Sequence, residues 1–173
     1  MESATIRRAR PEDRAAIDAI YEHFVRTSTC TYDERPGTDE ARRAWFESHG
    51  ERHPITVLED AGAILGWAAL SPWRERSGYR FTVELSVYVR DDARGRGHGA
   101  RLLADLVERA TRLGYHTLIG GISADQEASI RLHERLGFSR VAHFRQTGFK
   151  FGRWLDLAFY QLILRTPAAP VDG

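Results

Sequence analysis

The sequence contains one cysteine, one methionine and no long apolar run. Cys30 has no partner for a disulfide within the chain, and a metal site built from several cysteines is excluded. With 25 basic and 24 acidic residues the formal net charge is +1, so no overall field favours nucleic acid. No stretch approaches the roughly eighteen apolar residues of a membrane span, and no signal-peptide pattern opens the chain. We expect a cytoplasmic protein with neither a membrane nor a nucleic-acid partner.

The composition that is present is ordinary for a globular protein. Hydrophobic residues make up 42% and charged residues 28% of the 173 positions. This length suits one domain with a substantial core. We predict a single domain over residues 1–165, followed by a flexible tail over 166–173, because the Pro, Ala and Gly residues of the tail offer nothing to pack.

Hydrophobic periodicity divides the domain into alternating strands and helices. A strand is predicted at 79–89, where Val83, Leu85 and Val87 alternate with polar residues. A helix is predicted at 97–113, because its leucines recur at helical spacing. By the same criteria the other strands are expected at 5–9, 54–59, 63–71, 117–122, 138–146 and 154–164, and the other helices from Pro11, from Thr38 to Gly50 and at 126–136. The pattern predicts a mixed α/β (α+β) fold with one central sheet.

A glycine-rich segment, Arg94-Gly95-Arg96-Gly97-His98-Gly99, joins this strand to this helix. Glycine permits positive φ and close approach of a ligand to the backbone, and the N-terminus of a helix favours an anion. The arginines, with Arg101, add charge-assisted donors suited to a pyrophosphate. The segment lacks the Gly-Lys-Ser/Thr ending of the Walker pattern, and only His98 separates Gly97 from Gly99, where the dinucleotide fingerprint needs two residues. The segment is a candidate phosphate cradle, and a loop that only turns the chain is the alternative.

This segment fits the signature Arg/Gln-x-x-Gly-x-Gly/Ala of the GNAT superfamily of acetyltransferases, in which the loop holds the pyrophosphate of coenzyme A. The stretches VELSVYV, LHERLGF and GFKFGRWLD occur in this order. Together they resemble, more narrowly, the phosphinothricin and methionine sulfoximine acetyltransferase family. The resemblance implies the GNAT fold, in which about four helices flank one mixed, mostly antiparallel sheet. It also implies acetyl-CoA as co-substrate, a small-molecule amine as acceptor and a homodimer.

Glu84 is the candidate base for acetyl transfer. The reaction needs an unprotonated amine, and an α-amine with a pKa near 8 is about a tenth neutral at pH 7. Glu84 interrupts an apolar, β-rich strand, where a carboxylate is costly unless it has a function or a partner. Burial would raise its pKa into the useful range. The resemblance implies a base or an amine-binding carboxylate here, acting directly or through water; a solvated carboxylate or a structural ion pair is the alternative.

The helix predicted at 126–136 carries further candidates. His133 stands where many GNAT enzymes have a tyrosine that protonates the leaving thiolate, which implies either an acid or a hydrogen bond to the sulfur end of the cofactor. It shares one helix face with Ser129. Gln126 replaces the asparagine whose amide binds the cofactor in the family, so this contact is in question.

The resemblance implies roles in ligand binding for main-chain groups as well as for side chains. It implies that the main chain of Val87, Tyr88 and Val89 pairs with the acetyl and pantetheine part of the cofactor, one N–H serving as the oxyanion donor. Arg74 and Arg80 bracket the turn before the Glu84 strand and suit a carboxylate or phosphinate. The resemblance places Arg74 and Glu84–Ser86 in the acceptor pocket, with solvated loop charge as the alternative for Arg76.

Three features lie outside this scheme. His49 and His53 have the spacing of a helical metal pair, but Gly50 and Pro54 interrupt the helix, so no metal is predicted. Cys30 lacks the surroundings of a catalytic cysteine, so an inert thiol is expected. The GFKFGRWLD segment, with Lys150, Arg153 and Trp154, and the nearby Phe144, Phe149 and Phe151 are expected to meet a partner subunit, the pocket or the core.

The sequence thus predicts an acyltransferase that moves the acetyl group of acetyl-CoA directly to the α-amine of a small amino-acid-like substrate, of the phosphinothricin, methionine sulfoximine or methionine sulfone type. Two alternatives stay open. One keeps acetyl-CoA but makes the acceptor a protein N-terminus or a lysine. The other is a non-catalytic sensor module that binds acetyl-CoA without turnover.

Overall fold

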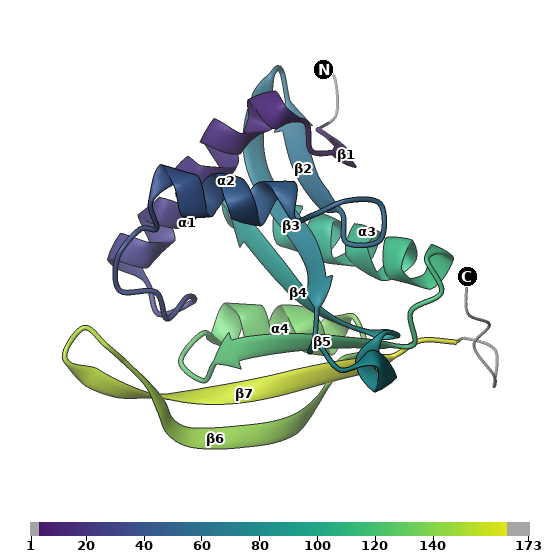
Figure 1. Cartoon of the computed structure of the whole chain (residues 1–173). Coiled ribbons are helices and arrows are strands. Elements are labelled where there is room, and N and C mark those ends of the chain that lie inside the picture. Colours follow the sequence, from purple (N-terminus) through teal and green to yellow (C-terminus); the bar gives the residue numbers. More distant parts are fainter. Residues whose placement is uncertain (1–3, 166–173) are drawn as a thin grey trace.

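The structure is a computed structural model that describes residues 4–165 (Figure 1). Within these residues one sheet contains seven strands in the order β1-β2-β3-β4-β5-β7-β6. The strands are β1 (Thr5–Arg8), β2 (Ile55–Asp60), β3 (Ala63–Pro72), β4 (Thr82–Val89), β5 (Thr117–Ser123), β6 (Ser139–Lys150) and β7 (Arg153–Ile163). The helices are α1 (Arg14–Thr27), α2 (Asp39–Glu47), α3 (His98–Arg112) and α4 (Glu127–Arg135). The tail predicted over 166–173 lies outside the described residues.

The sheet is mixed, with β4 and β5 as its parallel pair. The neighbours β1–β2, β2–β3, β3–β4, β5–β7 and β6–β7 are antiparallel. A parallel pair needs a crossover connection, and α3 supplies it between β4 and β5. The prediction of a mixed, mostly antiparallel sheet flanked by about four helices is confirmed.

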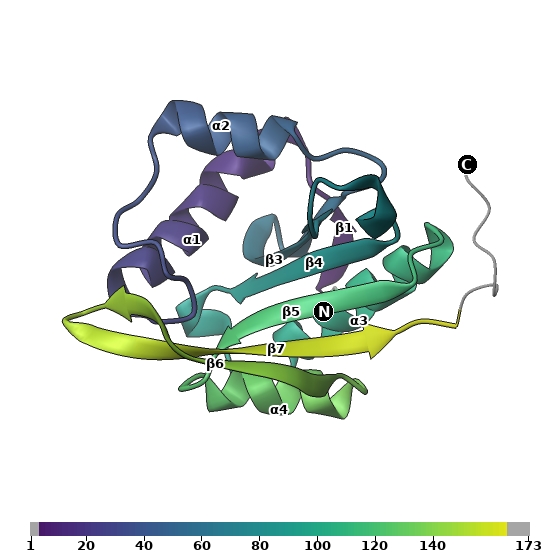
Figure 2. The same ribbon diagram turned by 60° about the horizontal axis from the view of Figure 1, so that its bottom comes forward.

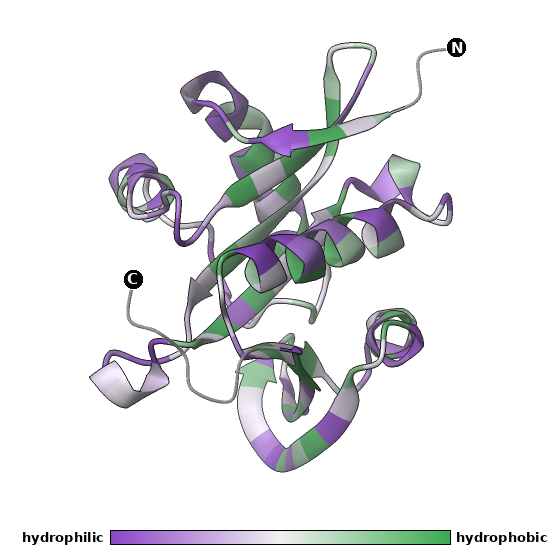
Figure 3. Cartoon of the chain, turned by 90° about the vertical axis from the view of Figure 1, so that its right-hand side faces the viewer, coloured by the Kyte–Doolittle hydropathy of each residue, from purple (hydrophilic) through white to green (hydrophobic). Residues whose placement is uncertain are grey.

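The helices cover both faces of the sheet, α1 and α2 on one side and α3 and α4 on the other (Figures 1 and 2). Because side chains alternate along a strand, β3 points Ala68 and Leu70 into the core under α3, and Trp67 and Ala69 into the core under α1. Figure 3 shows that hydrophobic residues concentrate in the strands, whereas the helices carry both kinds of residue. Each fully buried leucine stabilises such a core by roughly 1.5–3 kcal/mol. No helix within residues 4–165 has the length and apolar character to cross a membrane.

The hairpin of β6 and β7 departs from the predicted strand boundaries. The strand expected at 138–146 continues to Lys150, and a turn at Phe151 and Gly152, with φ of 51° and 73°, leads into β7. The register of β6 shifts between Arg140 and Ala142 and again between Phe144 and Gly148. These irregularities break the period-2 pattern, and this is why the sequence pattern ended the strand too early. The strand expected from residue 79 begins instead at Thr82, after a 3-10 turn.

Candidate active site

β4 and β5 separate within the sheet, and the site lies in this opening. The two strands pair only over Thr82–Glu84 and Thr117–Ile119, although both continue beyond. Arg90 donates its main-chain N–H to the main-chain oxygen of Leu65 on β3 (2.8 Å). Since the direction of hydrogen bonding alternates along a strand, the main-chain groups of Val87 and Val89 face the opening, whereas Tyr88 faces β3. Of the three residues predicted to offer main-chain groups to a ligand, Val87 and Val89 thus direct these groups into the opening and Tyr88 does not.

The glycine-rich loop lies at the N-terminus of α3. Gly95 and Gly97 have φ of 77° and 81°, in the left-handed region that glycine adopts without strain. α3 begins at His98 with Gly97 as an N-cap that provides no side-chain hydrogen bond. The first N–H groups of the helix thus have no intrahelical partner, and they are oriented to bind an anion.

The arginines around this loop have different roles. Arg94 lines the cavity described below, and its guanidinium carbon lies 5.8 Å from the centre of the Phe24 ring. Arg96 is exposed and does not line the cavity. Arg101 donates to the main-chain oxygen of Ala4, the residue before β1. Of the three predicted phosphate donors, Arg94 is the one that the structure places at the loop and the cavity together.

A cavity of about 450 Å³ connects the loop with the opening between β4 and β5. This volume lies within the range of small-molecule sites, roughly 300–1,000 Å³. The predicted residues that line it are Ser86, Val87, Tyr88, Val89, Arg94, Gly95, Gly97, His98, Gly99, Gln126, Ser129 and His133. Those that do not line it are Arg74, Arg80, Glu84 and Arg96. Most of the predicted cofactor set is therefore assembled around one cavity.

His133 is buried with one ring nitrogen unpaired. Its Nδ1 lies 2.8 Å from the main-chain oxygen of Ser129. Because a carbonyl oxygen only accepts, Nδ1 carries the proton, and Nε2 of the neutral ring is an acceptor. Nε2 has no hydrogen-bond partner in the part of the chain that the structure describes. Burial lowers the pKa of His133, so the ring is neutral at physiological pH. A buried acceptor without a partner fits a ligand that brings a hydrogen-bond donor into the cavity.

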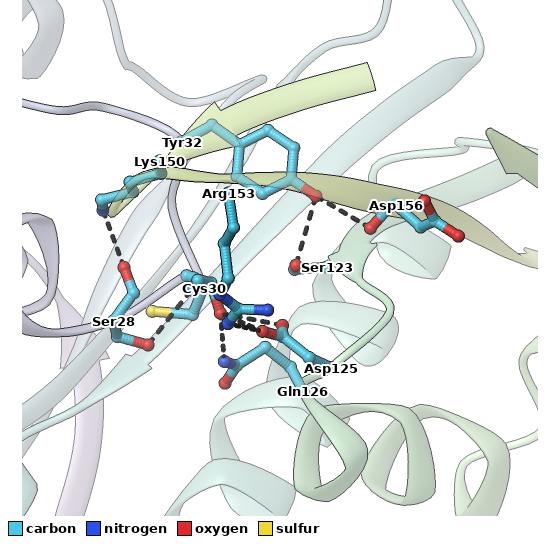
Figure 4. A network of polar contacts seen from close by, with 10 residues as sticks. Ser28, Cys30, Tyr32, Ser123, Asp125, Gln126, Lys150, Arg153 and Asp156 are labelled. Atoms are coloured by element: carbon cyan, nitrogen blue, oxygen red, sulfur yellow. Dashed lines mark hydrogen bonds and ion pairs between the residues drawn. The ribbon is translucent and has the colours of Figure 1, made fainter. Parts of the chain in front are cut away.

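The side-chain amide of Gln126 forms a hydrogen bond with another residue of the protein. Its Nε2 donates to Oγ1 of Thr29 (2.8 Å), and the Thr29 hydroxyl donates to Asp125 (2.8 Å). Asp125 also accepts from Nη2 of Arg153 (2.6 Å), as Figure 4 shows. The amide nitrogen of Gln126, whose contact with the cofactor was in question, therefore holds the loop after α1, and the residue also lines the cavity.

Glu84 lies at the closed end of the opening. It is the last residue of β4 paired with β5, and its partner on β3 is Ser71. A Cβ on Gly121, which lines the cavity, would lie 3.5 Å from its Oε1. Among residues 4–165 the half-buried carboxylate forms neither a hydrogen bond nor an ion pair. Burial raises the pKa of Glu84, and the charge of Arg74 opposes this shift. The carboxylate thus has the environment of a general base whose pKa lies above that of an ordinary glutamate.

Aromatic side chains surround the approach to Glu84. The rings of Trp73 and Phe159 are perpendicular with centroids 5.4 Å apart, and Phe144 packs edge-on against Phe159 at 5.7 Å. Phe159 also lies against Gly121, whose Cβ would be 3.3 Å from the ring. The guanidinium of Arg74 lies 5.1 Å from the Trp73 ring. The approach combines an apolar wall with one cation.

Arg80 is the second arginine predicted to bind the acceptor substrate, and its side chain contacts residues that are close to it in the sequence. Its Nη1 donates to the main-chain oxygen of Ser77 (3.2 Å), and its guanidinium lies 4.6 Å from the centre of the Phe81 ring. Of the two arginines, Arg74 is the one whose charge opposes the rise in the pKa of Glu84.

Several residues that line the cavity belong to none of the motifs identified in the sequence. Ser28 and Cys30 belong to the irregular loop after α1, and Gly120 and Gly121 to β5. The glycine pair was an available signal, because glycine within a strand often marks close approach of a ligand or side chain. Burial raises the pKa of the Cys30 thiol, which lowers its reactivity in line with the expected inert thiol.

His49 and His53, which have the spacing of a helical metal pair, both lie within hydrogen-bond distance of other protein groups. Nδ1 of His49 donates to the main-chain oxygen of Trp45 (2.7 Å), and Nε2 lies 3.1 Å from Oγ of Ser71. Nε2 of His53 lies 3.2 Å from the hydroxyl of Tyr115. The two rings thus have separate partners.

Comparison with known proteins identifies the family. Residues 17–138 match the model of the acetyltransferase (GNAT) family. The chain belongs to the GNAT acetyltransferase family. It is 44% identical to the L-methionine sulfoximine/L-methionine sulfone acetyltransferase of Salmonella typhimurium, over 96% of this chain and 98% of that protein. It is 42% identical to the phosphinothricin N-acetyltransferase of Streptomyces coelicolor, over 87% of this chain and 90% of that protein.

A solved GNAT structure agrees with the fold of this acyltransferase. The acetyltransferase yncA of Salmonella typhimurium, determined with its cofactor acetyl-CoA, superposes with a TM-score of 0.94 and 42% identity, covering 99% of this chain and 100% of that one. The predicted membership of the GNAT superfamily, and the narrower likeness to the phosphinothricin and methionine sulfoximine enzymes, are confirmed.

Proposed function

We propose that this GNAT enzyme transfers the acetyl group of acetyl-CoA directly to the α-amine of a small amino-acid-like substrate. The acceptor class is that of methionine sulfoximine, methionine sulfone and phosphinothricin. The observation that carries the proposal is the half-buried Glu84 without a partner, at the closed end of the opening between β4 and β5. The names of the relatives support the acceptor class.

Some residues of the site would bind acetyl-CoA, and Glu84 would remove the proton from the amine. The N–H groups at the start of α3 and Arg94 would hold the pyrophosphate of acetyl-CoA. The main-chain groups of Val87 and Val89 would pair with its pantetheine arm, and an N–H there would stabilise negative charge on the thioester oxygen. Acetyl-CoA would supply the acetyl group, and Glu84 would take the proton from the attacking amine, directly or through water. As the new C–N bond forms, the C–S bond breaks and CoA leaves as a thiolate, which needs little acid help because the pKa of a thiol is near 8.5.

The acceptor side suits an amino acid with a compact polar end. Arg74 would attract a carboxylate, sulfone or phosphinate oxygen, and the rings of Trp73 and Phe159 would cover the aliphatic part. An α-amine needs less help than a lysine amine, because a larger fraction of it is neutral at pH 7. The carboxylate of Glu84 therefore suffices for a small α-amino acid.

We assign His133 a hydrogen bond to the cofactor rather than acid catalysis. The neutral ring has its proton on Nδ1, where the Ser129 carbonyl holds it, so Nε2 has none to give. We expect His133→Phe to lower kcat by less than about tenfold at pH 7.5, whereas loss of a true general acid costs about 10²–10⁴. Steady-state thiol release measures this. A loss above a hundredfold, with acetyl-CoA binding intact, would contradict the assignment.

We also propose a cytoplasmic homodimer formed through the β6–β7 hairpin. Phe149, Phe151 and Trp154 are 48%, 55% and 62% exposed, and Phe144 and Val141 on the same hairpin are exposed as well. Such a patch of large apolar side chains typically marks an interface. Sedimentation equilibrium of the 19.7 kDa chain tests the assembly.

The proposed function is tested by CoA-thiol release with a panel of acceptors. Methionine sulfoximine, methionine sulfone and phosphinothricin are expected to give saturable turnover, and ordinary amino acids and a lysine peptide much less. Turnover confined to the peptide would move the acceptor to proteins. Binding of acetyl-CoA without turnover of any amine would overturn the enzyme assignment in favour of a sensor.

A further inference from the structure

The loop between α1 and α2 forms one wall of the cavity without any regular structure of its own. Ser28 and Cys30 line the cavity directly. The segment has no helical or strand hydrogen bonds after Ser28. Its position therefore depends on side chains from other elements.

Lys150 supplies the first of these contacts. It is the only lysine of the sequence, lies at the end of β6 and is 1% exposed. Its Nζ donates to the main-chain oxygens of Ser28 (2.7 Å) and Thr31 (2.8 Å), the first of which is drawn in Figure 4. Between residues 4 and 165 no carboxylate comes within ion-pair distance of it. An ammonium buried against two carbonyls is costly, and a space-filling role would be served better by methionine or leucine.

The other contacts hold the loop from two further directions. Thr29 is fixed by Asp125 and Gln126, at the start of α4. The ring of Tyr32 lies on Gly148 of β6, where a Cβ would be 2.5 Å from it. The Tyr32 hydroxyl donates to the main-chain oxygen of Asp156 on β7 (2.9 Å). The loop is thus clamped between the β6–β7 hairpin and the β5–α4 turn.

We propose that Lys150 is a positioning residue for the cofactor cavity, because its ammonium fixes the two carbonyls that set the path of the loop carrying Ser28 and Cys30. The proposal rests on the proposed acetyl transfer. Lys150 does not line the cavity, so it acts through Ser28 and Thr31. Ser28 and Cys30 line the same cavity as Arg94 and the glycines of the phosphate loop, whereas Glu84 and Arg74 do not line it. Loss of the ammonium should therefore weaken the binding of acetyl-CoA more than that of the acceptor.

The kinetic test compares Lys150→Met with Lys150→Arg. We expect the methionine variant to raise KM for acetyl-CoA about tenfold or more, since two charge-assisted hydrogen bonds to the cavity loop are lost, with KM for the acceptor changed less than about twofold. The arginine variant retains a cation and should recover part of the loss. Val57→Ala, in the core under α1, is the control for general destabilisation. Equal changes in both KM values, or the same rise in KM for acetyl-CoA in Val57→Ala at matched loss of Tm, would overturn the proposal.

A labelling test does not depend on the acceptor or on the folding of Lys150→Met. An amine-specific reagent has two targets in this chain, the α-amine and Lys150, and peptide mapping separates them. We expect native Lys150 to react at least about a hundredfold more slowly than in denaturant, and Thr29→Ala to raise this rate by loosening the loop. Fast labelling of native Lys150, or no effect of Thr29→Ala, would overturn the positioning role of Lys150 even if the proposed acetylation stands. Protection of Lys150 without turnover of any amine would remove the proposed function and leave the anchor in place.

Discussion

Glu84→Gln is expected to lower kcat/KM for the acceptor amine by about 10²–10³, within the range of about 10²–10⁴ for loss of a general base. The dissociation constant of acetyl-CoA should stay within about twofold, because Glu84 does not line the cavity that holds the cofactor residues. The amide keeps the shape of the side chain but cannot take the proton of the amine. Thiol release under saturating acetyl-CoA measures the effect.

The pH profile separates a base from a carboxylate that only binds. In the wild type, log kcat/KM falls with a slope of one below the pKa of the acceptor amine. Below the raised pKa of Glu84 the slope becomes two, because both the amine and the carboxyl are then protonated. The glutamine variant should keep a slope of one throughout. A loss by the same factor at every pH would contradict the base assignment.

Stability should change in the opposite direction from activity. Burial raises the pKa of Glu84, so folding favours the protonated carboxyl, and stability is lost as the pH rises through that pKa. Glu84→Gln should therefore unfold at a higher temperature than the wild type at pH 7, and at the same temperature in acid. Glu59→Gln is the matched control. Arg7 donates to Glu59 at 2.6 Å, far from the cavity, so this variant should lose stability and keep activity.

The parts of the fold that the sequence predicted rest on local patterns. The alternation along β4 and the leucine spacing of α3 are decided within a few residues, and the glycines between them need only the local backbone. Candidate cofactor residues could therefore be named, with the help of the family resemblance, before any tertiary contact was known. Glu84 stood out for the same reason, since a lone carboxylate in an apolar strand is visible in sequence alone.

The parts that sequence could not predict depend on long-range contacts. Lys150 binds carbonyls 122 and 119 residues away, and Gln126 binds Thr29 across 97 residues. No periodicity connects such positions. The departure at Gln126 was visible, but whether its longer amide reached the cofactor or the loop depended on where α1 ended. The sole lysine within an aromatic segment was a signal of a buried cation, although not of its partners.

The second large effect concerns the phosphate loop. Gly97→Val is expected to raise the dissociation constant of acetyl-CoA about 10- to 100-fold, which corresponds to about 1.4–2.8 kcal/mol. Gly97 has a φ of 81° as the N-cap of α3, and a β-branched residue there is strongly disfavoured. The backbone must rotate out of this region, and the N–H groups at the start of α3 then no longer converge on one anion. Isothermal titration with acetyl-CoA measures the loss.

Gly62→Val separates this effect from backbone strain. Gly62 has a φ of 79° in the β2–β3 turn, away from the cavity, and a Cβ at either glycine meets nothing within 4 Å. Both valines impose the same kind of strain, about 1–3 kcal/mol, so both should lower Tm by similar amounts. Only the variant at Gly97 should lose affinity for acetyl-CoA. Equal affinities in the two variants would mean that the loop only turns the chain, and the anion site would then have to lie elsewhere along the cavity.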